Sequence, residues 1–306
     1  MTIASIDIGT NTILMVIAEY DINTGKLKTL LNEHQIPRIG KGLTPGSPIS
    51  DDKALLLLEI LRDYKRIADS CNCDKIIATA TNAFRIASNR DELLNRIKVE
   101  TGIDVNVVTG EEESFLSYLG ATIDADSDEP VLVIDIGGGS TEIITGKGDK
   151  ILFRKSFHTG VVSSTEYYFK NDPPAMEDIV SFNANLQNIF EELNDRNFII
   201  SRTIAIAGTP TTLACIKQSL YEYDEDLIEG SKLIKTEIGA IISELTHLSS
   251  SQIKKKYKAV VSGREDVLLA GSLILFHLMN ILKIDEVIVS TKGIRYGAIV
   301  LNQMSG

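Results

Sequence analysis

Hydrophobic and polar positions alternate along the chain in short blocks that predict a mixture of strands and helices. Residues 3–8 and 13–19 are apolar runs on either side of a polar turn, and they predict two strands. Residues 50–69 carry apolar side chains at helical spacing behind Ser50, a residue type that often caps helices. Because strands and helices alternate, the pattern favours an α/β architecture. Further strands are predicted at 75–79, 104–108, 131–136, 203–207 and 286–290, and further helices at 111–122, 231–247 and 266–282.

An acidic stretch at residues 124–130 interrupts this pattern. It has no hydrophobic periodicity and ends in proline, so we expect a linker there. The sequence then predicts two domains, residues 1–125 and 126–306, with a final helix at about 293–306 that packs back on the first domain. The apolar helix 266–282 suits either the core or a homodimer face, and we expect it in the core.

The first strand and its turn recur once in the sequence. Residues 6–12 (IDIGTNT) align with residues 134–140 (IDIGGGS), so the two copies are offset by 128 positions. Each copy ends an apolar strand and precedes a second β-like run. We therefore expect two similar halves that face each other across a cleft.

Both turns have the composition of a phosphate-binding loop. Glycines remove the Cβ atoms that would keep an oxyanion from the backbone amides, and these glycines are Gly137, Gly138 and Gly139. Hydroxyl and amide side chains add further donors, namely Thr10, Asn11, Thr12, Ser140 and Thr141. One such turn fits a tight hairpin equally well, but the pair favours phosphate.

A carboxylate ends each strand just before its loop. Asp7 and Asp135 are suited to hold Mg²⁺ directly or through water, because this ion prefers hard oxygen ligands and retains waters. Glu142 adds a second carboxylate in the second copy. We therefore expect Mg²⁺, or another divalent cation such as Mn²⁺, as the cofactor.

Candidate acidic and cationic residues lie between the two loops in the sequence. Residues 111–113 are three glutamates at the start of a predicted helix, a position that the helix dipole also favours for negative charge. The pattern does not say which glutamate orients a water for attack on phosphorus. Arg85, which follows the strand 75–79, either clamps phosphate with two hydrogen bonds or lies exposed on a helix.

Charge and composition limit how such a substrate is captured. The net charge of −11 and the pI near 5.0 argue against non-specific nucleic-acid binding, so a polyanion must be held by local amides, cations and metal. No apolar run reaches the roughly 18 residues needed to span a bilayer. The start of the chain lacks the basic region of a signal peptide, and three cysteines give no disulfide framework. We expect a cytoplasmic protein with no membrane partner.

Several blocks together resemble the exopolyphosphatase / guanosine pentaphosphate phosphatase family. Residues 7–12 and 133–142 are similar to its phosphate motifs, residues 80–89 to its second block, and residues 109–120 to the block with its catalytic glutamate. Later blocks match at 207–209, at Arg264 with Asp266, at 270–271 and at 290–297. The glycine triplet alone would also admit sugar kinases and actin-like ATPases. The glutamate block and the Gly-Ile-Arg-x-Gly ending would not.

The resemblance implies an actin-like ATPase fold with a ribonuclease-H-like core in each half. It also implies Mg²⁺-dependent removal of the terminal phosphate from inorganic polyphosphate, or of the 5′ γ-phosphate from guanosine pentaphosphate. The family's catalytic glutamate falls on Glu113 and its phosphate arginine on Arg85. Its metal and loop residues fall on Asp7, Gly9, Thr10, Asn11, Thr12, Asp135, Gly137, Gly138, Ser140, Thr141 and Glu142, and we add Gly139, Gly208 and Thr209 to the substrate-binding set.

Some features depart from the family pattern. The first loop reads Thr-Asn-Thr where Ser-Asn-Ser is usual, which keeps the hydroxyls. Ser163 stands where arginine is common, and Ala207 replaces the first of two glycines before Thr209. Longer relatives continue into a C-terminal helical domain with a His-Asp motif, and without that domain the resemblance does not extend to processivity on long chains.

Two other functions fit the same residues. One is an ATP-dependent kinase or ATPase of the same fold, which would transfer phosphate to a small acceptor. The other is a sensor that binds an alarmone and turns it over slowly. The sequence does not rank polyphosphate against guanosine pentaphosphate.

Overall fold

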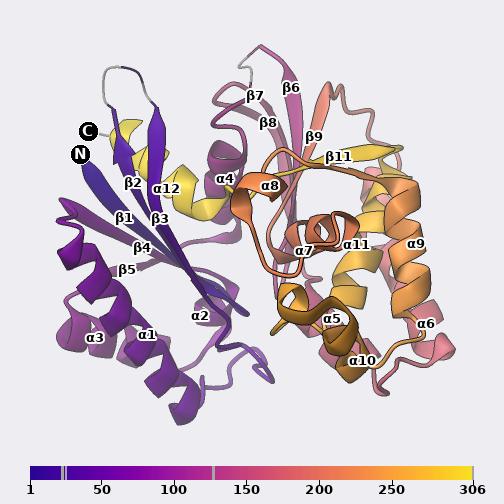
Figure 1. Ribbon diagram of the computed structural model, residues 1–306, viewed down its shortest axis with the longest axis horizontal. Helices are drawn as coiled ribbons and strands as arrows, with labels where there is room; N and C mark the ends of the chain where they lie inside the picture. Colours follow the sequence, from indigo (N-terminus) through magenta and orange to yellow (C-terminus); the bar gives the residue numbers. More distant parts are fainter. Residues whose placement is uncertain (22–23, 25, 126–127, 305–306) are drawn as a thin grey trace. The chain divides into compact units, whose positions relative to one another are not determined.

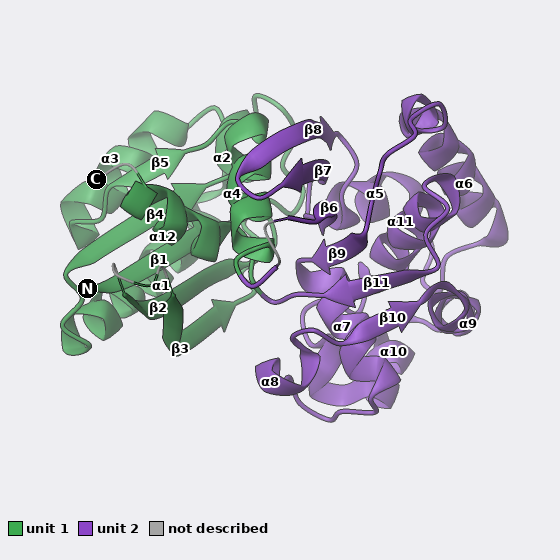
Figure 2. Cartoon of the chain, turned by 90° about the horizontal axis from the view of Figure 1, so that it is seen from above, with its two compact units in different colours: residues 1–123, 292–306 green, residues 124–291 purple. Residues whose placement is uncertain are grey.

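The computed structural model describes residues 1–21, 24, 26–125 and 128–304 (Figure 1). The chain divides into two compact units (Figure 2): unit 1 comprises Met1–Ile123 and Lys292–Gly306, and unit 2 comprises Asp124–Thr291. Part of the predicted linker, residues 126–127, lies outside the described residues. The last helix of the chain is thus grouped with unit 1, although it follows unit 2 in the sequence.

Unit 1 is built on a five-stranded sheet. Its strands are β1 (Thr2–Ile8), β2 (Ile13–Tyr20), β3 (Leu27–Gln35), β4 (Lys75–Ala80) and β5 (Val105–Val107), in the order β3-β2-β1-β4-β5. The β1–β2 and β2–β3 pairs are antiparallel, whereas β4 pairs in parallel with both β1 and β5. The helices of this unit are α1 (Asp51–Ser70), α2 (Asn82–Ile86), α3 (Arg90–Thr101), α4 (Gly110–Ala121) and α12 (Ile294–Met304).

Alternation along β1 decides which side chains reach each face of this sheet. Ile6 and Ile8 join the core under α1 and α3, whereas Ile3 packs with Tyr296 of α12 on the opposite face. Side chains two residues apart on a strand share a face. Asp7 is four residues after Ile3 on this strand, so its carboxylate lies on the same face of the sheet as α12.

Unit 2 is built on a six-stranded sheet, in the order β10-β11-β9-β6-β7-β8. The strands are β6 (Pro130–Ile136), β7 (Thr141–Lys147), β8 (Lys150–Phe157), β9 (Arg202–Ile206), β10 (Lys232–Ile234) and β11 (Glu286–Val289). The α-helices are α5 (Val161–Tyr168), α6 (Met176–Ile189), α7 (Gly208–Lys217), α8 (Glu225–Ile228), α9 (Lys235–Leu245), α10 (Ser250–Tyr257) and α11 (Leu268–Ile281). Short 3₁₀ turns span Glu191–Leu193 and Lys258–Val261.

Unit 2 repeats the pairing pattern of unit 1. In unit 1 the antiparallel strands β3, β2 and β1 are followed by β4 and β5, which run parallel to β1. In unit 2 the antiparallel strands β8, β7 and β6 are followed by β9 and β11, which run parallel to β6. The irregularity between Ile17 and Ala18 in the β2–β3 pair recurs between Thr145 and Gly146 in the β7–β8 pair, again 128 positions later. The predicted fold class of two similar α/β domains with a ribonuclease-H-like core is confirmed.

Two local predictions were wrong. Residues 231–247 are not one helix, because Lys232–Ile234 pairs with β11 as a strand and α9 begins only at Lys235. Leu233 is buried between two exposed neighbours, a period of two that the helical interpretation missed. Ser50 occupies the N-cap of α1 but makes no capping bond; a hydrogen bond from its side chain lowers the pKa of Asp52 instead.

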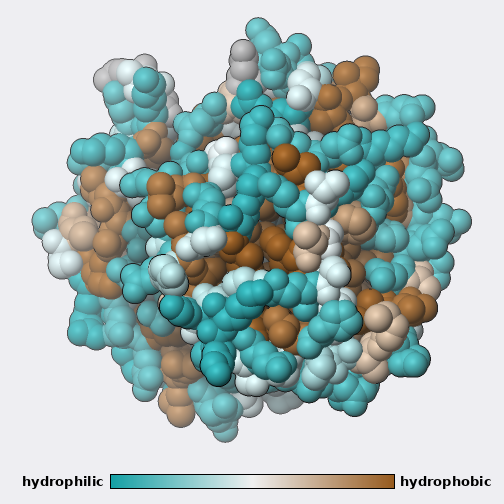
Figure 3. Space-filling view, turned by 45° about the vertical axis from the view of Figure 1, so that its right-hand side comes forward, coloured by the Kyte–Doolittle hydropathy of each residue, from teal (hydrophilic) through white to brown (hydrophobic). Residues whose placement is uncertain are grey.

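Hydrophilic residues predominate on the face drawn in Figure 3, and hydrophobic residues form smaller patches between them. In the part of the chain that the structure describes, no helix is long and apolar enough to cross a bilayer. Most residues of the apolar helix α11 are buried, and they belong to the hydrophobic core of unit 2.

His277, on α11, makes the stability of unit 2 sensitive to pH. Its Nε2 atom is enclosed and has no hydrogen-bond partner among the described residues, and burial lowers the pKa of the imidazole. As the pH falls below about 6.5, the unfolded chain gains a proton that the folded chain resists. The free energy of unfolding should therefore fall as the pH decreases from about 6.5 towards 5, and His277→Leu should flatten this dependence in denaturant titrations.

The matched control is His247→Gln, which removes an exposed histidine from the same unit and leaves His277 in place. This variant should keep the wild-type slope. A wild-type slope in His277→Leu would contradict the assignment.

Candidate active site

In both units the predicted site residues follow the C-terminal ends of parallel strands. In unit 1 the first loop follows β1, the helix with Arg85 follows β4, and the helix with Glu113 follows β5. In unit 2 the glycine loop follows β6 and the helix beginning at Gly208 follows β9. Because neighbouring parallel strands end at the same edge of a sheet, each unit gathers its candidate residues at one edge, where α/β proteins commonly bind ligands.

The two loops are closed by the same hydrogen bond. The amide of Gly9 donates to the carbonyl of Thr12 at 2.9 Å, and the amide of Gly137 donates to the carbonyl of Ser140 at 2.9 Å. A Cβ atom on either glycine would lie 3.1 Å from that carbonyl oxygen. The sequence repeat therefore extends to the geometry of the loops.

Between the two hydrogen-bonded ends of each loop lie backbone amides that make no hydrogen bond of their own to the residues that the structure describes. The amides of Thr10 and Asn11 in the first loop, and of Gly138 and Gly139 in the second, have no acceptor within the described ranges. Successive amides in a tight turn form a concave site for an oxyanion. Each loop therefore has two such N–H groups that are oriented to donate to an oxyanion.

Helix α5 fixes the glycine loop of unit 2 from behind. The amides of Val161 and Val162 donate to the carbonyls of Gly137 and Gly138 at 2.9 and 2.8 Å. A Cβ atom at Gly160 would lie 2.5 Å from the backbone of Gly138, so only glycine permits this approach. Helix α5 thus holds two consecutive carbonyls of the loop.

Two of the predicted side-chain donors are enclosed within their own unit. The Oγ1 of Thr141 donates to the carbonyl of Thr159 at 2.6 Å. The Oγ1 of Thr209 packs against α11, where a Cβ atom on Gly271 would lie 2.1 Å from it. At Gly208 and Thr209 the donors that remain are the amides in the first turn of α7.

Burial and capping distinguish the three glutamates of α4. Glu111 and Glu112 are exposed, and the Glu112 carboxylate accepts the amide of Thr109 at 2.8 Å as part of a capping box. Glu113 is only 7% exposed. It is the member of the three whose carboxylate is enclosed by the protein.

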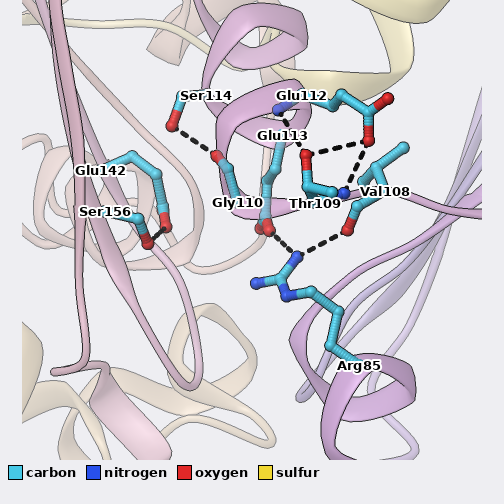
Figure 4. Close-up of polar contacts among 9 residues, drawn as sticks. All are labelled: Arg85, Val108, Thr109, Gly110, Glu112, Glu113, Ser114, Glu142 and Ser156. Carbon is cyan, nitrogen blue, oxygen red and sulfur yellow. Dashed lines mark hydrogen bonds and ion pairs between the residues drawn. The ribbon is translucent and has the colours of Figure 1, made fainter.

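Arg85 and Glu113 form an ion pair at this edge of unit 1 (Figure 4). The Nη1 atom of Arg85 donates to Oε2 of Glu113 at 2.5 Å and to the carbonyl of Val108 at 3.0 Å. Both side chains are largely shielded from water, so the pair is weakly screened. The structure thus places the two residues together, as a cation and a carboxylate at one site.

Asp135 and Glu142 are opposite each other on β6 and β7. Both are buried, and Oε1 of Glu142 accepts a hydrogen bond from the hydroxyl of Ser156 at 2.6 Å (Figure 4). Like charges directly opposite on a sheet repel each other, and a cation relieves this. In unit 1 the equivalent Asp7 is opposite Leu14, so the second carboxylate is specific to unit 2.

This pair fits a Mg²⁺ ion that keeps several waters. Mg²⁺ takes oxygen ligands and is commonly held by one or two carboxylates, with water and substrate phosphate completing the shell. No group of three His, Cys, Asp or Glu side chains that could hold a metal occurs among the described residues. Asp135 and Glu142 would supply two of the oxygen ligands of such an ion.

Arg264 also belongs to this edge of unit 2, although the sequence placed it only in a matching block. Its Nη1 atom donates to Oγ1 of Thr212 at 3.2 Å, and a Cβ atom at Gly208 would lie 2.9 Å from its Cζ atom. Burial lowers the pKa of the guanidinium. Its spatial proximity to Gly208 was not visible in the sequence.

The sequence profile of the Ppx/GppA phosphatase family matches residues 16–304. The chain belongs to this family. A bifunctional 3-dehydroquinate synthase/phosphatase of Fusobacterium nucleatum is 29% identical over an alignment of 307 positions, which covers 97% of this chain and 46% of that protein. The chain thus spans about half the length of this relative. Exopolyphosphatase 2 of Mycobacterium tuberculosis is 28% identical over an alignment of 309 positions, which covers 96% of each protein.

Solved structures of the family agree with the fold. A crystal structure of the Aquifex aeolicus family member has a TM-score of 0.85 and 32% identity, and the match covers 100% of this chain and 98% of that one. An exopolyphosphatase from Cytophaga hutchinsonii has a TM-score of 0.89 and 26% identity, again over 100% and 98% of the two chains.

Helix α4, which carries Glu113, crosses α12 in direct backbone contact. A Cβ atom at Gly120 would lie 2.0 Å from the carbonyl oxygen of Gly293, and one at Gly297 would lie 1.9 Å from that of Leu116. No side chain fits between the two helices at these points. Leu116 is one turn beyond Glu113, so the crossing sets the position of the carboxylate.

Gly297→Ala should therefore destabilise the protein. Helix propensity alone would make alanine more stable than glycine by about 1 kcal/mol, but the clash with Leu116 reverses the sign and should lower the midpoint of thermal unfolding. Gly239→Ala in α9 is the control, because its Cβ atom would meet only the ring of Phe276, at 3.3 Å. If Gly297→Ala melts at or above the wild-type temperature, the close crossing is wrong.

Ala207, the departure from the family's glycine pair, has a backbone conformation that favours glycine. Its φ of 75° and ψ of −166° lie in a region that costs other residues of order 1–3 kcal/mol. Ala207→Gly should therefore raise the free energy of unfolding by about 1 kcal/mol, as measured by denaturant titration.

Ala205→Gly, two residues earlier on β9, is the control for Ala207→Gly. Ala205 has no positive φ and is fully buried, so glycine there should lower stability. A loss of stability in both variants would contradict strain at Ala207.

Proposed function

We propose that the protein is an exopolyphosphatase, a hydrolase that removes the terminal phosphate from inorganic polyphosphate with Mg²⁺. The observation that carries this proposal is the ion pair between buried Glu113 and half-buried Arg85, at the edge of unit 1 that also bears the first loop. A carboxylate that lies beside an arginine able to bind phosphate is placed to accept a proton from an attacking water. The relatives from M. tuberculosis and C. hutchinsonii, which are named exopolyphosphatases, support the same substrate.

The two loops bind phosphate groups through their amides. Thr10 and Asn11 offer N–H donors in unit 1, and Gly138 and Gly139 offer them in unit 2. Amides that are already oriented by the fold need no reorganisation when charge develops on the phosphoryl oxygens. They also give a chain with a net charge of −11 a local means of holding a polyanion.

Glu113 serves as the general base for the attacking water. A phosphate oxygen that takes up the donors of Arg85 weakens their bond to Glu113 and leaves the carboxylate able to accept a proton. The oxygen of the water then bonds to the terminal phosphorus, and the bond from that phosphorus to the bridging oxygen breaks. The products are orthophosphate and a chain that is one phosphate shorter.

Asp135 and Glu142 would hold the Mg²⁺ ion. When bound, the ion neutralises charge on the phosphoryl oxygens of the substrate. The 5′ γ-phosphate of guanosine pentaphosphate is a terminal phosphoanhydride with the same chemistry. It is therefore the second substrate to be compared with polyphosphate.

The test is a phosphate-release panel over polyphosphates of several lengths, guanosine pentaphosphate and ATP. The wild type should release phosphate from polyphosphate with Mg²⁺ and not with excess EDTA. Glu113→Gln should lower kcat by about 10²–10⁴-fold, the range of general acid–base catalysis, while the protein still binds polyphosphate.

Glu112→Gln is the matched control for the panel. Glutamine also completes a capping box, so this variant should keep both the helix and the turnover. Wild-type turnover in Glu113→Gln would show that Glu113 is not the base.

A further inference from the structure

The first loop needs a cation that the residues assigned so far do not fully supply. Nη1 of Arg85 donates to Glu113 and to the carbonyl of Val108, so much of its charge is already compensated. The loop itself, Thr10 to Thr12, is uncharged, and it directly follows the strand that bears Asp7. Phosphate at this loop would therefore meet amides and a carboxylate, with little net positive charge.

A segment after β3, residues 37–41, is bonded directly to this loop. The amide of Arg38 donates to the carbonyl of Asn11 at 3.0 Å, and the amide of Gly40 donates to the carbonyl of Thr10 at 2.9 Å. The segment is therefore hydrogen-bonded to two consecutive loop residues, which fixes the backbone of Arg38 beside the loop.

Close packing and a lysine hold the same segment. A Cβ atom at Gly40 would lie 2.3 Å from Cγ2 of Thr10, so the glycine lets the two backbones approach. Lys53 of α1 donates to the carbonyl of Pro37 at 2.9 Å. The position of Arg38 is thus set by its neighbours on both sides.

Arg38 occupies a backbone conformation that suits glycine better than arginine. Its φ is 53°, in the left-handed region, which costs a residue with a Cβ atom of order 1–2 kcal/mol. Strained residues of this kind cluster at ligand sites. An arginine in this conformation is consistent with a use for its charge beside the loop.

An independent observation points to a ligand at the same place. Asn11 is 8% exposed, and its Oδ1 atom is buried with no hydrogen-bond partner among the residues described. A buried amide oxygen without a partner is costly, and a ligand or a water bound to it would satisfy this atom. Turning the amide over would instead direct its NH₂ group, a phosphate donor, to the same point.

We propose that Arg38 is a phosphate-binding residue of the first loop, where it contacts the phosphate chain together with the amides of Thr10 and Asn11. The proposal rests on the proposed function for its substrate class, inorganic polyphosphate. It gives the segment 37–41 a role in capture that the sequence motifs did not assign.

The test compares Arg38→Gly with Lys283→Gly. Lys283 is an exposed residue of unit 2 with a φ of 55°, so both variants remove one positive charge and relieve the same backbone strain. Both should therefore raise the midpoint of thermal unfolding. Arg38→Gly alone should weaken binding of inorganic tripolyphosphate, measured by calorimetry with Mg²⁺, by about tenfold or more, as expected for a lost charge-assisted hydrogen bond.

Kinetics separate a binding role from a structural one. Arg38→Gly should raise KM for polyphosphate more than it lowers kcat, and Arg38→Lys, which keeps the charge but loses the bidentate geometry, should lie between it and the wild type. If Arg38→Gly binds tripolyphosphate as tightly as Lys283→Gly, the proposal is overturned.

The binding measurement also separates this proposal from the proposed function. A wild type that binds tripolyphosphate through Arg38 but releases no phosphate would overturn the hydrolase and leave Arg38 supported. If the wild type hydrolyses polyphosphate and Arg38→Gly binds tripolyphosphate as tightly as the wild type, the proposal for Arg38 would be overturned and the hydrolase supported. A wild type that does not bind tripolyphosphate would overturn both.

Discussion

A hydrogen bond from a glycine amide to the carbonyl three residues later shapes both loops, and the rest of each site depends on it. It turns the chain sharply at the end of β1 and of β6, and the two amides within each turn have no acceptor among the residues that the structure describes. A Cβ atom on either glycine would press against the carbonyl at 3.1 Å. Sheet register, strand irregularity and loop closure all recur at the same spacing, so this bond belongs to a repeat of the whole unit rather than of a short motif.

The ion pair of Arg85 and Glu113 is the second constraint. It brings together two helices that follow different strands, and it holds the carboxylate of Glu113 beside the guanidinium of Arg85. The glycine crossing of α4 and α12 positions this carboxylate from the other side of its helix. The position of Glu113 in unit 1 thus depends on α12, which is far from Glu113 in the sequence.

Much of this could be predicted from the sequence, because strand patterning and the loop repeat are local signals. Local sequence patterns do not distinguish the three adjacent glutamates of α4. Glu112 takes part in a capping box, and only the folded chain shows that Glu113 is buried. The same holds for Thr141, whose hydroxyl faces the carbonyl of Thr159, and for Arg264, which meets Gly208 only in space. A strand as short as β10 is difficult to recognise in the sequence when a helix with a similar mixture of polar and apolar residues begins at the next residue.

The central claim is that water, and not another acceptor, takes the terminal phosphate. It is tested most directly by running the reaction on polyphosphate in ¹⁸O-labelled water and measuring the ¹⁸O content of the released phosphate by mass spectrometry. Attack by water on the terminal phosphorus predicts one labelled oxygen in each phosphate released. Unlabelled phosphate, or phosphate found on another acceptor as in a kinase, would contradict the account.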